Sequence, residues 1–181
     1  MVALLRAYAS METMSVRSPE NILLHLPEEQ DAYVREIFAE IGRRDLPNPG
    51  QRPHISVTFA QQMSPAVVDL AAELLPTVIP TTLRRVGTVV FGTRSKQTIA
   101  WLLEADPELH KVAAKLSEAN PEGRGPMWIP HLTVGLRVPK QVVPRYLETL
   151  ADVTSSHFKE IRVDRASFWR PSVQQERILA E

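Results

Sequence analysis

The chain has 181 residues, 44% of them hydrophobic, which is enough for one domain, or two small packed lobes, with a real core. Its 21 basic and 21 acidic residues balance, which excludes the overall positive charge typical of proteins that bind long duplex nucleic acid. Binding of a short single-stranded end or a nucleotide in a local basic cleft remains compatible with this balance. The absence of cysteine excludes disulfides, thiolate catalysis and cysteine-ligated metal centres.

The first segment, residues 1–18, has little fold signal, and we predict that it is an extension before a single domain of residues 19–181. Its apolar start is interrupted by Arg6 and lacks the basic start and long apolar core of a signal peptide. No apolar run approaches the roughly 20 residues that a membrane span needs. We therefore expect a cytoplasmic monomer that does not associate with membranes.

The first part of the domain alternates strand and helix patterns. The apolar residues 21–26 predict a buried strand, and residues 27–42 have the apolar spacing of a helix. A turn-rich loop leads to a strand at 53–59. Ser64 then provides a hydroxyl cap, followed by proline, for a helix over 65–75.

The second part repeats this order and adds strands between and after. Its predicted elements are strands at 82–91 and 97–104 that form a hairpin, a helix capped by Asp106, a strand at 128–138, a helix at 139–150, and strands at 158–169 and 174–179. The two parts resemble a diverged duplication. Close alternation combined with hairpins favours an α+β (mixed α/β) fold with mostly antiparallel sheets over a doubly wound parallel sheet.

Two of the strands begin with nearly the same residues. One reads Pro-His-Ile-Ser-Val over 53–57, and the other reads Pro-His-Leu-Thr-Val over 130–134. Side chains alternate between faces along a strand, so His54 shares a face with Ser56, and His131 shares one with Thr133. The intervening apolar residues point into a core. If the two strands meet, one cleft holds two imidazoles and two hydroxyls.

These groups suit acid–base chemistry on a phosphodiester. In-line attack needs a base at the nucleophile and an acid at the leaving oxygen, and two imidazoles with ordinary pKa values near 6.5 supply both. Ser56 and Thr133 would donate hydrogen bonds to the non-bridging phosphate oxygens. The sequence does not say whether His54 or His131 is the base.

Other interpretations of the motifs remain open. A single histidine in a strand is more often structural than catalytic. A metal site on His54 and His131 would have too few ligands, since no carboxylate lies at fixed spacing beside either. A non-catalytic module that binds an RNA end or a nucleotide in the same cleft is the main alternative to an enzyme.

Several residues near the motifs are candidates for further contacts. Arg52, Arg124, Arg137 and Lys140 could contact phosphate. Trp128 could stack on a base, although a regular strand would point it away from His131. Core packing is expected for two other aromatic residues, Phe59 and Trp101. The remaining histidines lack the motif and are assigned no chemistry: His25, His110 and His157.

The paired motifs, each after a strand–helix unit, resemble the two-histidine phosphoesterase superfamily, in particular its 2′-5′ RNA ligase-like branch, which includes cyclic phosphodiesterases. The similarity extends from about residue 21 to the C-terminus. It rests on Leu-Pro-Glu-Glu at 26–29, the two histidine strands, Ile-Ala-Trp-Leu at 99–102 and Asp-Pro-Glu-Leu at 106–109.

The resemblance implies two pseudo-symmetric lobes, each a mostly antiparallel sheet with helices outside, around a central cleft lined by both motifs. It implies an enzyme without metal or cofactor that acts on a 2′,3′-cyclic phosphate or a 2′-5′ phosphodiester, as a hydrolase or a ligase. Its partner would be an RNA end or a small nucleotide. Two departures are Ser56, where threonine is commoner, and Arg137, which shares the His131 face only if no bulge occurs near Gly135.

Overall fold

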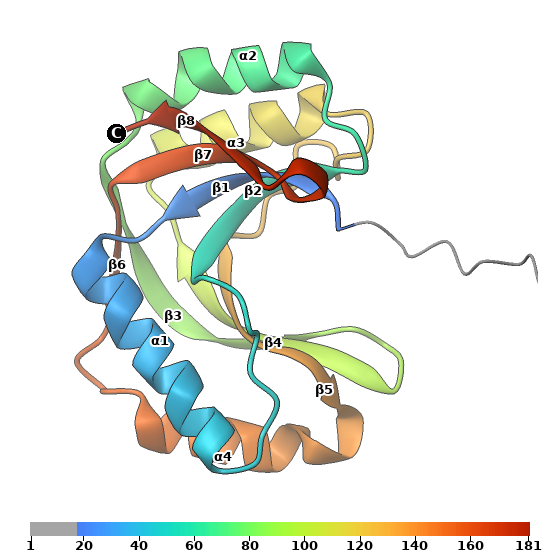
Figure 1. Ribbon diagram of the computed structural model, residues 1–181. Coiled ribbons are helices and arrows are strands. Elements are labelled where there is room, and N and C mark those ends of the chain that lie inside the picture. Colours follow the sequence, from blue (N-terminus) through green and yellow to red (C-terminus); the bar gives the residue numbers. More distant parts are fainter. Residues whose placement is uncertain (1–17) are drawn as a thin grey trace, which may run out of the picture.

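Strands of the computed structural model, which describes residues 18–181, form an eight-stranded antiparallel sheet (Figure 1). Its strand order is β6-β3-β4-β5-β2-β1-β7-β8. The strands are β1 (Glu20–His25), β2 (His54–Ala60), β3 (Thr81–Phe91), β4 (Lys96–Glu104), β5 (His131–Pro139), β6 (Glu160–Val163), β7 (Arg165–Arg170) and β8 (Gln175–Ala180). The predicted extension falls almost entirely outside the described residues.

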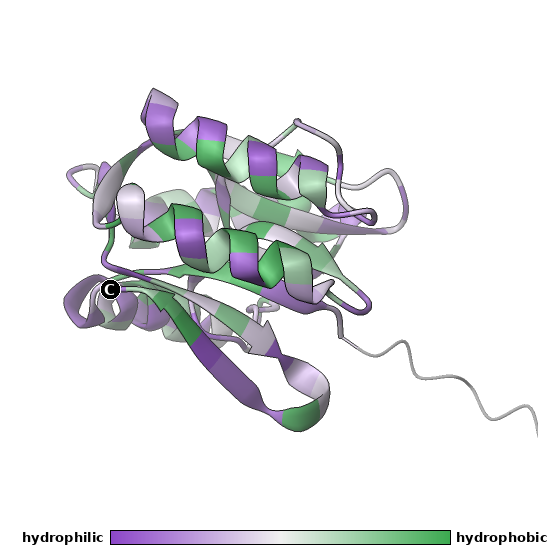
Figure 2. Ribbon diagram, turned by 90° about the horizontal axis from the view of Figure 1, so that it is seen from above, coloured by the Kyte–Doolittle hydropathy of each residue, from purple (hydrophilic) through white to green (hydrophobic). Residues whose placement is uncertain are grey.

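Four helices cover the sheet in two pairs: α1 (Glu28–Arg43), α2 (Pro65–Leu74), α3 (Pro107–Ala119) and α4 (Val143–Val153). Helices α1 and α4 pack together beside β3, β4 and β5, whereas α2 and α3 lie over β1, β2, β7 and β8 (Figure 1). Hydrophilic and hydrophobic bands alternate along the helices nearest the viewer in Figure 2, as expected where one face packs on a sheet. The predicted α+β class is confirmed.

The sheet consists of two four-stranded halves that correspond to the two lobes. One half has the order β6-β3-β4-β5 and the other β2-β1-β7-β8, and they join where β2 pairs with β5. The central pair is short, with Ile55 opposite Leu132. Both of these side chains are fully buried. Each histidine strand is therefore the inner strand of its half, and the two strands meet at the centre of the molecule.

The structure corrects three sequence expectations about elements. The predicted strand at 158–169 is two strands in opposite halves, because β6 pairs with β3 while β7 pairs with β1. The second histidine strand begins at His131 and not at Trp128. Ser64 precedes helix α2 but makes no side-chain capping bond, whereas Asp106 accepts hydrogen bonds from the Glu108 and Leu109 amides as predicted.

No helix in residues 18–181 is long and apolar enough to cross a membrane.

Candidate active site

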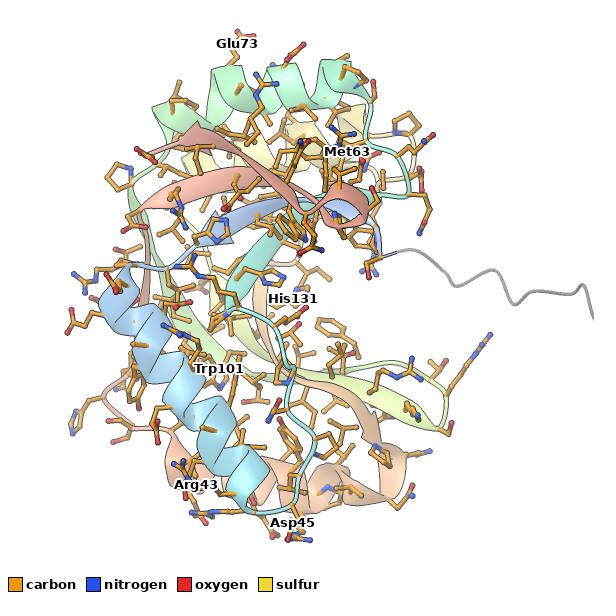
Figure 3. All side chains as sticks on the ribbon, in the orientation of Figure 1. Arg43, Asp45, Met63, Glu73, Trp101 and His131 are labelled. Atoms are coloured by element: carbon orange, nitrogen blue, oxygen red, sulfur yellow. The ribbon has the colours of Figure 1, made fainter. Side chains whose placement is uncertain are left out.

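The pairing of β2 with β5 brings the two motifs together. With Ile55 opposite Leu132, the antiparallel register sets His54 across from Thr133 and Ser56 across from His131. All four lie on the face opposite to the buried Ile55 and Leu132. In an antiparallel pair, the Cα atoms of diagonal neighbours such as His54 and His131 lie about 7–8 Å apart. A phosphate group between the two imidazoles can contact both at this spacing. Figure 3 shows His131 between the two halves of the molecule.

Both imidazoles are held in the same way. Nδ1 of His54 lies 2.7 Å from the carbonyl oxygen of Arg52, and Nδ1 of His131 lies 2.7 Å from that of Ile129. A carbonyl only accepts hydrogen bonds, so each Nδ1 carries the proton and donates. Nε2 of each neutral ring is then left to accept or, once protonated, to donate a proton. The mirrored contacts make the two histidines equivalent in geometry.

The surroundings lower the pKa of both histidines below the ordinary value of 6.5. Burial is the main cause for each, and the backbone hydrogen bond at Nδ1 opposes it. The charge of His131 lowers the pKa of His54 further, and the charge of Arg124 lowers that of His131. The effect of His131 on His54 means that the two rings interact electrostatically, so protonation of one disfavours protonation of the other. The two rings therefore titrate as a coupled pair, and the singly protonated form lies between the two titration steps.

A cavity of about 690 Å³ lies beside His54, Ser56 and Thr133. A smaller one of about 150 Å³ lies beside His131, and Ser56 and Phe59 line both. The two cavities therefore adjoin at Ser56 and Phe59, and together they are called the cleft below. Ring centroids of Phe91 and His131 are 4.9 Å apart in the smaller part.

A β-bulge follows the hydroxyl residue of the first motif. The adjacent residues Ile22 and Leu23 pair with Thr58 and Ser56, which leaves Val57 as the extra residue. The bulge shifts the alternation, so Phe59 joins Ser56 on the cleft face. Its side chain is 44% exposed. The expectation that Phe59 packs in the core is therefore wrong.

A bulge at the same spacing follows the second motif. The adjacent residues Ile99 and Ala100 pair with Gly135 and Thr133, which leaves Val134 as the extra residue. A Cβ on Gly135 would lie 2.8 Å from the ring of Tyr146, so glycine is required there.

The second bulge places an apolar side chain where a cation was expected. Leu136 lines the larger cavity with Thr133, in the position that Phe59 occupies after the first motif. Arg137 has φ +56°, is exposed and does not line this cavity. The strand is not regular, so the condition under which Arg137 would share the face of His131 is not met.

Two further candidates have clear surroundings. Arg52 borders the larger cavity, and its Nε donates to Oδ1 of the buried Asp31 at 3.1 Å. Trp128 is 6% exposed, and its Nε1 donates to the Ser56 carbonyl oxygen at 3.0 Å. This contact fastens the loop before β5 to β2 and gives Trp128 a structural role. Trp128 also lines the smaller cavity beside His131, so its stacking on a base stays a prediction. Trp101 is fully buried, as predicted.

The chain matches the family model for the 2′-5′ RNA ligase superfamily over residues 26–175. The chain belongs to this superfamily. The match spans both motifs and all four helices, in agreement with the resemblance found in the sequence. No curated protein matches the sequence.

Two solved structures of one protein share the fold of this chain. Kluyveromyces marxianus Usb1 superposes with a TM-score of 0.51 at 12% identity, covering 92% of this chain and 99% of that one. The same protein with uridine monophosphate gives the same score and identity, covering 92% and 100%. A crystal structure of a phosphoesterase has a TM-score of 0.48 and 12% identity, covering 90% and 94%.

Sequence reasoning missed His25 and Asn21. Side chains alternate between faces along the predicted strand at 21–26, which places Asn21 and His25 on the face away from the buried Ile22 and Leu24. The sequence therefore contained the signal that could have identified them. His25 pairs across β1 and β2 with His54 and lines the same cavity. Its Nε2 lies 2.6 Å from Oγ of Ser167 and 3.1 Å from Oε1 of Glu176.

Burial and the neighbouring charges determine the protonation state of His25. Burial lowers the pKa of His25 to about 4, opposed by the charge of Glu176 and assisted by those of Arg165, Arg52 and His54. His25 is therefore neutral near pH 7.

No cluster of three or more His, Cys, Asp or Glu side chains that could hold a metal ion occurs within residues 18–181.

The lowered pKa of His25 predicts a loss of stability in acid. The unfolded chain binds this proton near pH 6.5, and the folded chain only near pH 4. The contribution is thus complete above pH 6.5 and is lost as the pH falls through this window, by at most about 3 kcal/mol. We expect His25→Gln to unfold with a shallower acid dependence in urea titrations at pH 4–7. Equal slopes for the two proteins would contradict this.

Proposed function

We propose that the protein is an enzyme that acts on a 2′,3′-cyclic phosphate or a 2′-5′ phosphodiester of an RNA end or nucleotide, by two-histidine acid–base catalysis without metal. The observation that carries this proposal is the mirrored pair of imidazoles. Each Nδ1 is fixed by a backbone carbonyl, and each Nε2 is left for proton transfer. Usb1 with uridine monophosphate supports a nucleotide ligand for the shared fold.

Hydrolysis of a cyclic phosphate would proceed by one in-line displacement. The neutral histidine takes a proton from water as the water oxygen bonds to phosphorus. The bond from phosphorus to one ribose oxygen breaks, and the protonated histidine gives its proton to that oxygen. Ser56 and Thr133 donate to the non-bridging oxygens. In the ligase direction a 5′ hydroxyl takes the place of water.

The charge of the cleft suits a phosphodiester, which carries one negative charge. Leu136 stands at the wall position where an arginine would have added a full positive charge. Arg52 is already paired with Asp31, Glu176 adds a negative charge to the wall of the larger cavity, and Arg124 adds a positive charge to the wall of the smaller one. A terminal phosphomonoester, with two negative charges near pH 7, would be bound less favourably.

The first test is turnover in the presence of a chelator. We expect the purified protein to hydrolyse 2′,3′-cyclic nucleotides or cyclic-ended RNA at an unchanged rate in excess EDTA, because both proton transfers use imidazole. The measurement is product formation by chromatography for the cyclic nucleotides, cyclic-ended RNA and 2′-5′ dinucleotides.

Two other results would change the proposal. Loss of turnover in EDTA with rescue by a divalent ion would contradict a metal-free mechanism. Binding of these ligands without any turnover would favour the non-catalytic binding module.

A further inference from the structure

The two motifs differ at one position, and the structure offers a reason. The first motif has Ser56 where the second has Thr133. The β-branch of threonine restricts χ1, whereas serine rotates among three staggered positions. A hydroxyl that must donate to a phosphate oxygen works only when it points toward that oxygen. Ser56 therefore needs another group to fix its direction, and Thr133 does not.

Asn21 is in contact with this hydroxyl. Its Nδ2 donates to Oγ of Ser56 at 2.8 Å, in a partly buried position between β1 and β2. The bulge at Val57 sets Ser56 opposite Leu23, next to Asn21 on the same face. Among the side-chain hydrogen bonds of residues 18–181, none involves the Thr133 hydroxyl. The added contact thus occurs only at the motif that lacks the β-methyl group.

The direction of this hydrogen bond matters for the chemistry. Because Asn21 donates, the Ser56 oxygen uses a lone pair as acceptor and keeps its own hydrogen to donate. Oδ1 of Asn21 is buried and has no partner in the described residues, so that end of the amide does not face the open cleft. Asn21 lines the larger cavity, and its one side-chain hydrogen bond within residues 18–181 is the bond to Ser56.

We propose that Asn21 is a positioning residue that fixes the Ser56 hydroxyl for donation to the substrate phosphate and so replaces the β-methyl group of a threonine. The inference rests on the proposed function for its catalytic consequence. It concerns one hydroxyl of the site and assigns Asn21 no contact with the substrate.

The test combines kinetics with a rescue. Asn21→Ala frees Ser56 to occupy three rotamers, so we expect kcat to fall about 3–10-fold with little change in KM. Asn21→Leu keeps a similar side-chain volume but has no hydrogen-bond donor, so it should lower kcat by a similar factor. This variant replaces Asn21→Ala in the test if the alanine variant unfolds. In either background, Ser56→Thr should restore most of kcat, because the new β-methyl group fixes the hydroxyl.

A double-mutant cycle separates positioning from direct contact. If Asn21 acts through Ser56, Asn21→Ala costs nothing further once Ser56→Ala has removed the hydroxyl. An additive loss, or a failure of Ser56→Thr to rescue, would overturn the proposal and indicate direct contact or a general structural effect. An unchanged kcat in both Asn21 variants would also overturn it.

A measurement without turnover distinguishes this inference from the proposed function. In protein with isotope-labelled serine, the Hα–Hβ couplings of Ser56 should report one staggered rotamer in the wild type and averaged rotamers in Asn21→Ala. Averaged couplings in the wild type, or one rotamer in both proteins, would reject the positioning role. An inactive wild type with the expected couplings would reject the proposed function and leave the positioning role intact.

Discussion

Replacing either His54 or His131 with alanine is expected to lower kcat for a 2′,3′-cyclic nucleotide by about 10²–10⁴-fold, the usual contribution of a general acid or base. The two losses should be similar, because both imidazoles have the same carbonyl contact and the same free Nε2. Each variant removes one of the two proton transfers. The measurement is steady-state turnover with the fold checked by circular dichroism.

A matched control uses another histidine of the chain. His157 is exposed and outside the cleft, so His157→Ala should keep the wild-type rate. Near wild-type rates with weakened ligand binding in both motif variants would show that the motifs bind phosphate without catalysing its transfer.

The pH dependence of the same reaction reports the roles of the two rings. A mechanism with one neutral and one protonated histidine gives a bell-shaped profile. Because burial lowers the pKa of both His54 and His131, we expect both limbs of the profile to lie below the ordinary value of 6.5. Each alanine variant should lose one limb. Persistence of both limbs in either variant would assign the pH dependence to other groups.

The parts of the site that depend on local periodicity were predictable from the sequence. Two-residue alternation placed His54 with Ser56 and His131 with Thr133, and the structure shows the same faces. The helices followed from apolar spacing and from prolines at their first positions, with errors of a few residues at their ends. These signals are carried by neighbouring residues, which the sequence displays directly.

The parts that depend on pairing between distant strands were not predictable. A bulge changes which residue faces the cleft, and it is defined by the pairing with another strand, as Gly135 opposite Ile99 illustrates. For this reason Phe59 and Leu136 face the cleft while Arg137 does not. The contacts of Asn21 with Ser56 and of His25 with Glu176 likewise join residues far apart in the chain.

Removal of the two hydroxyls is the second large effect that we expect. Ser56→Ala and Thr133→Val each delete one donor to the non-bridging oxygens, and we expect kcat to fall about 10–10³-fold. The losses should be smaller than those of the histidine variants, because the proton transfers remain and one hydroxyl still donates. The measurement is kcat and KM for the same cyclic nucleotide.

Variants that keep the hydroxyl provide the control and a sharper comparison. Thr133→Ser retains the donor but loses the β-methyl group, and no hydrogen bond to its hydroxyl within residues 18–181 replaces that constraint. We therefore expect a loss of only about threefold, from the three staggered rotamers of serine. If Thr133→Val keeps the wild-type kcat while Thr133→Ser is slow, the methyl group and not the hydroxyl matters at this position, and phosphate donation by the second motif is contradicted.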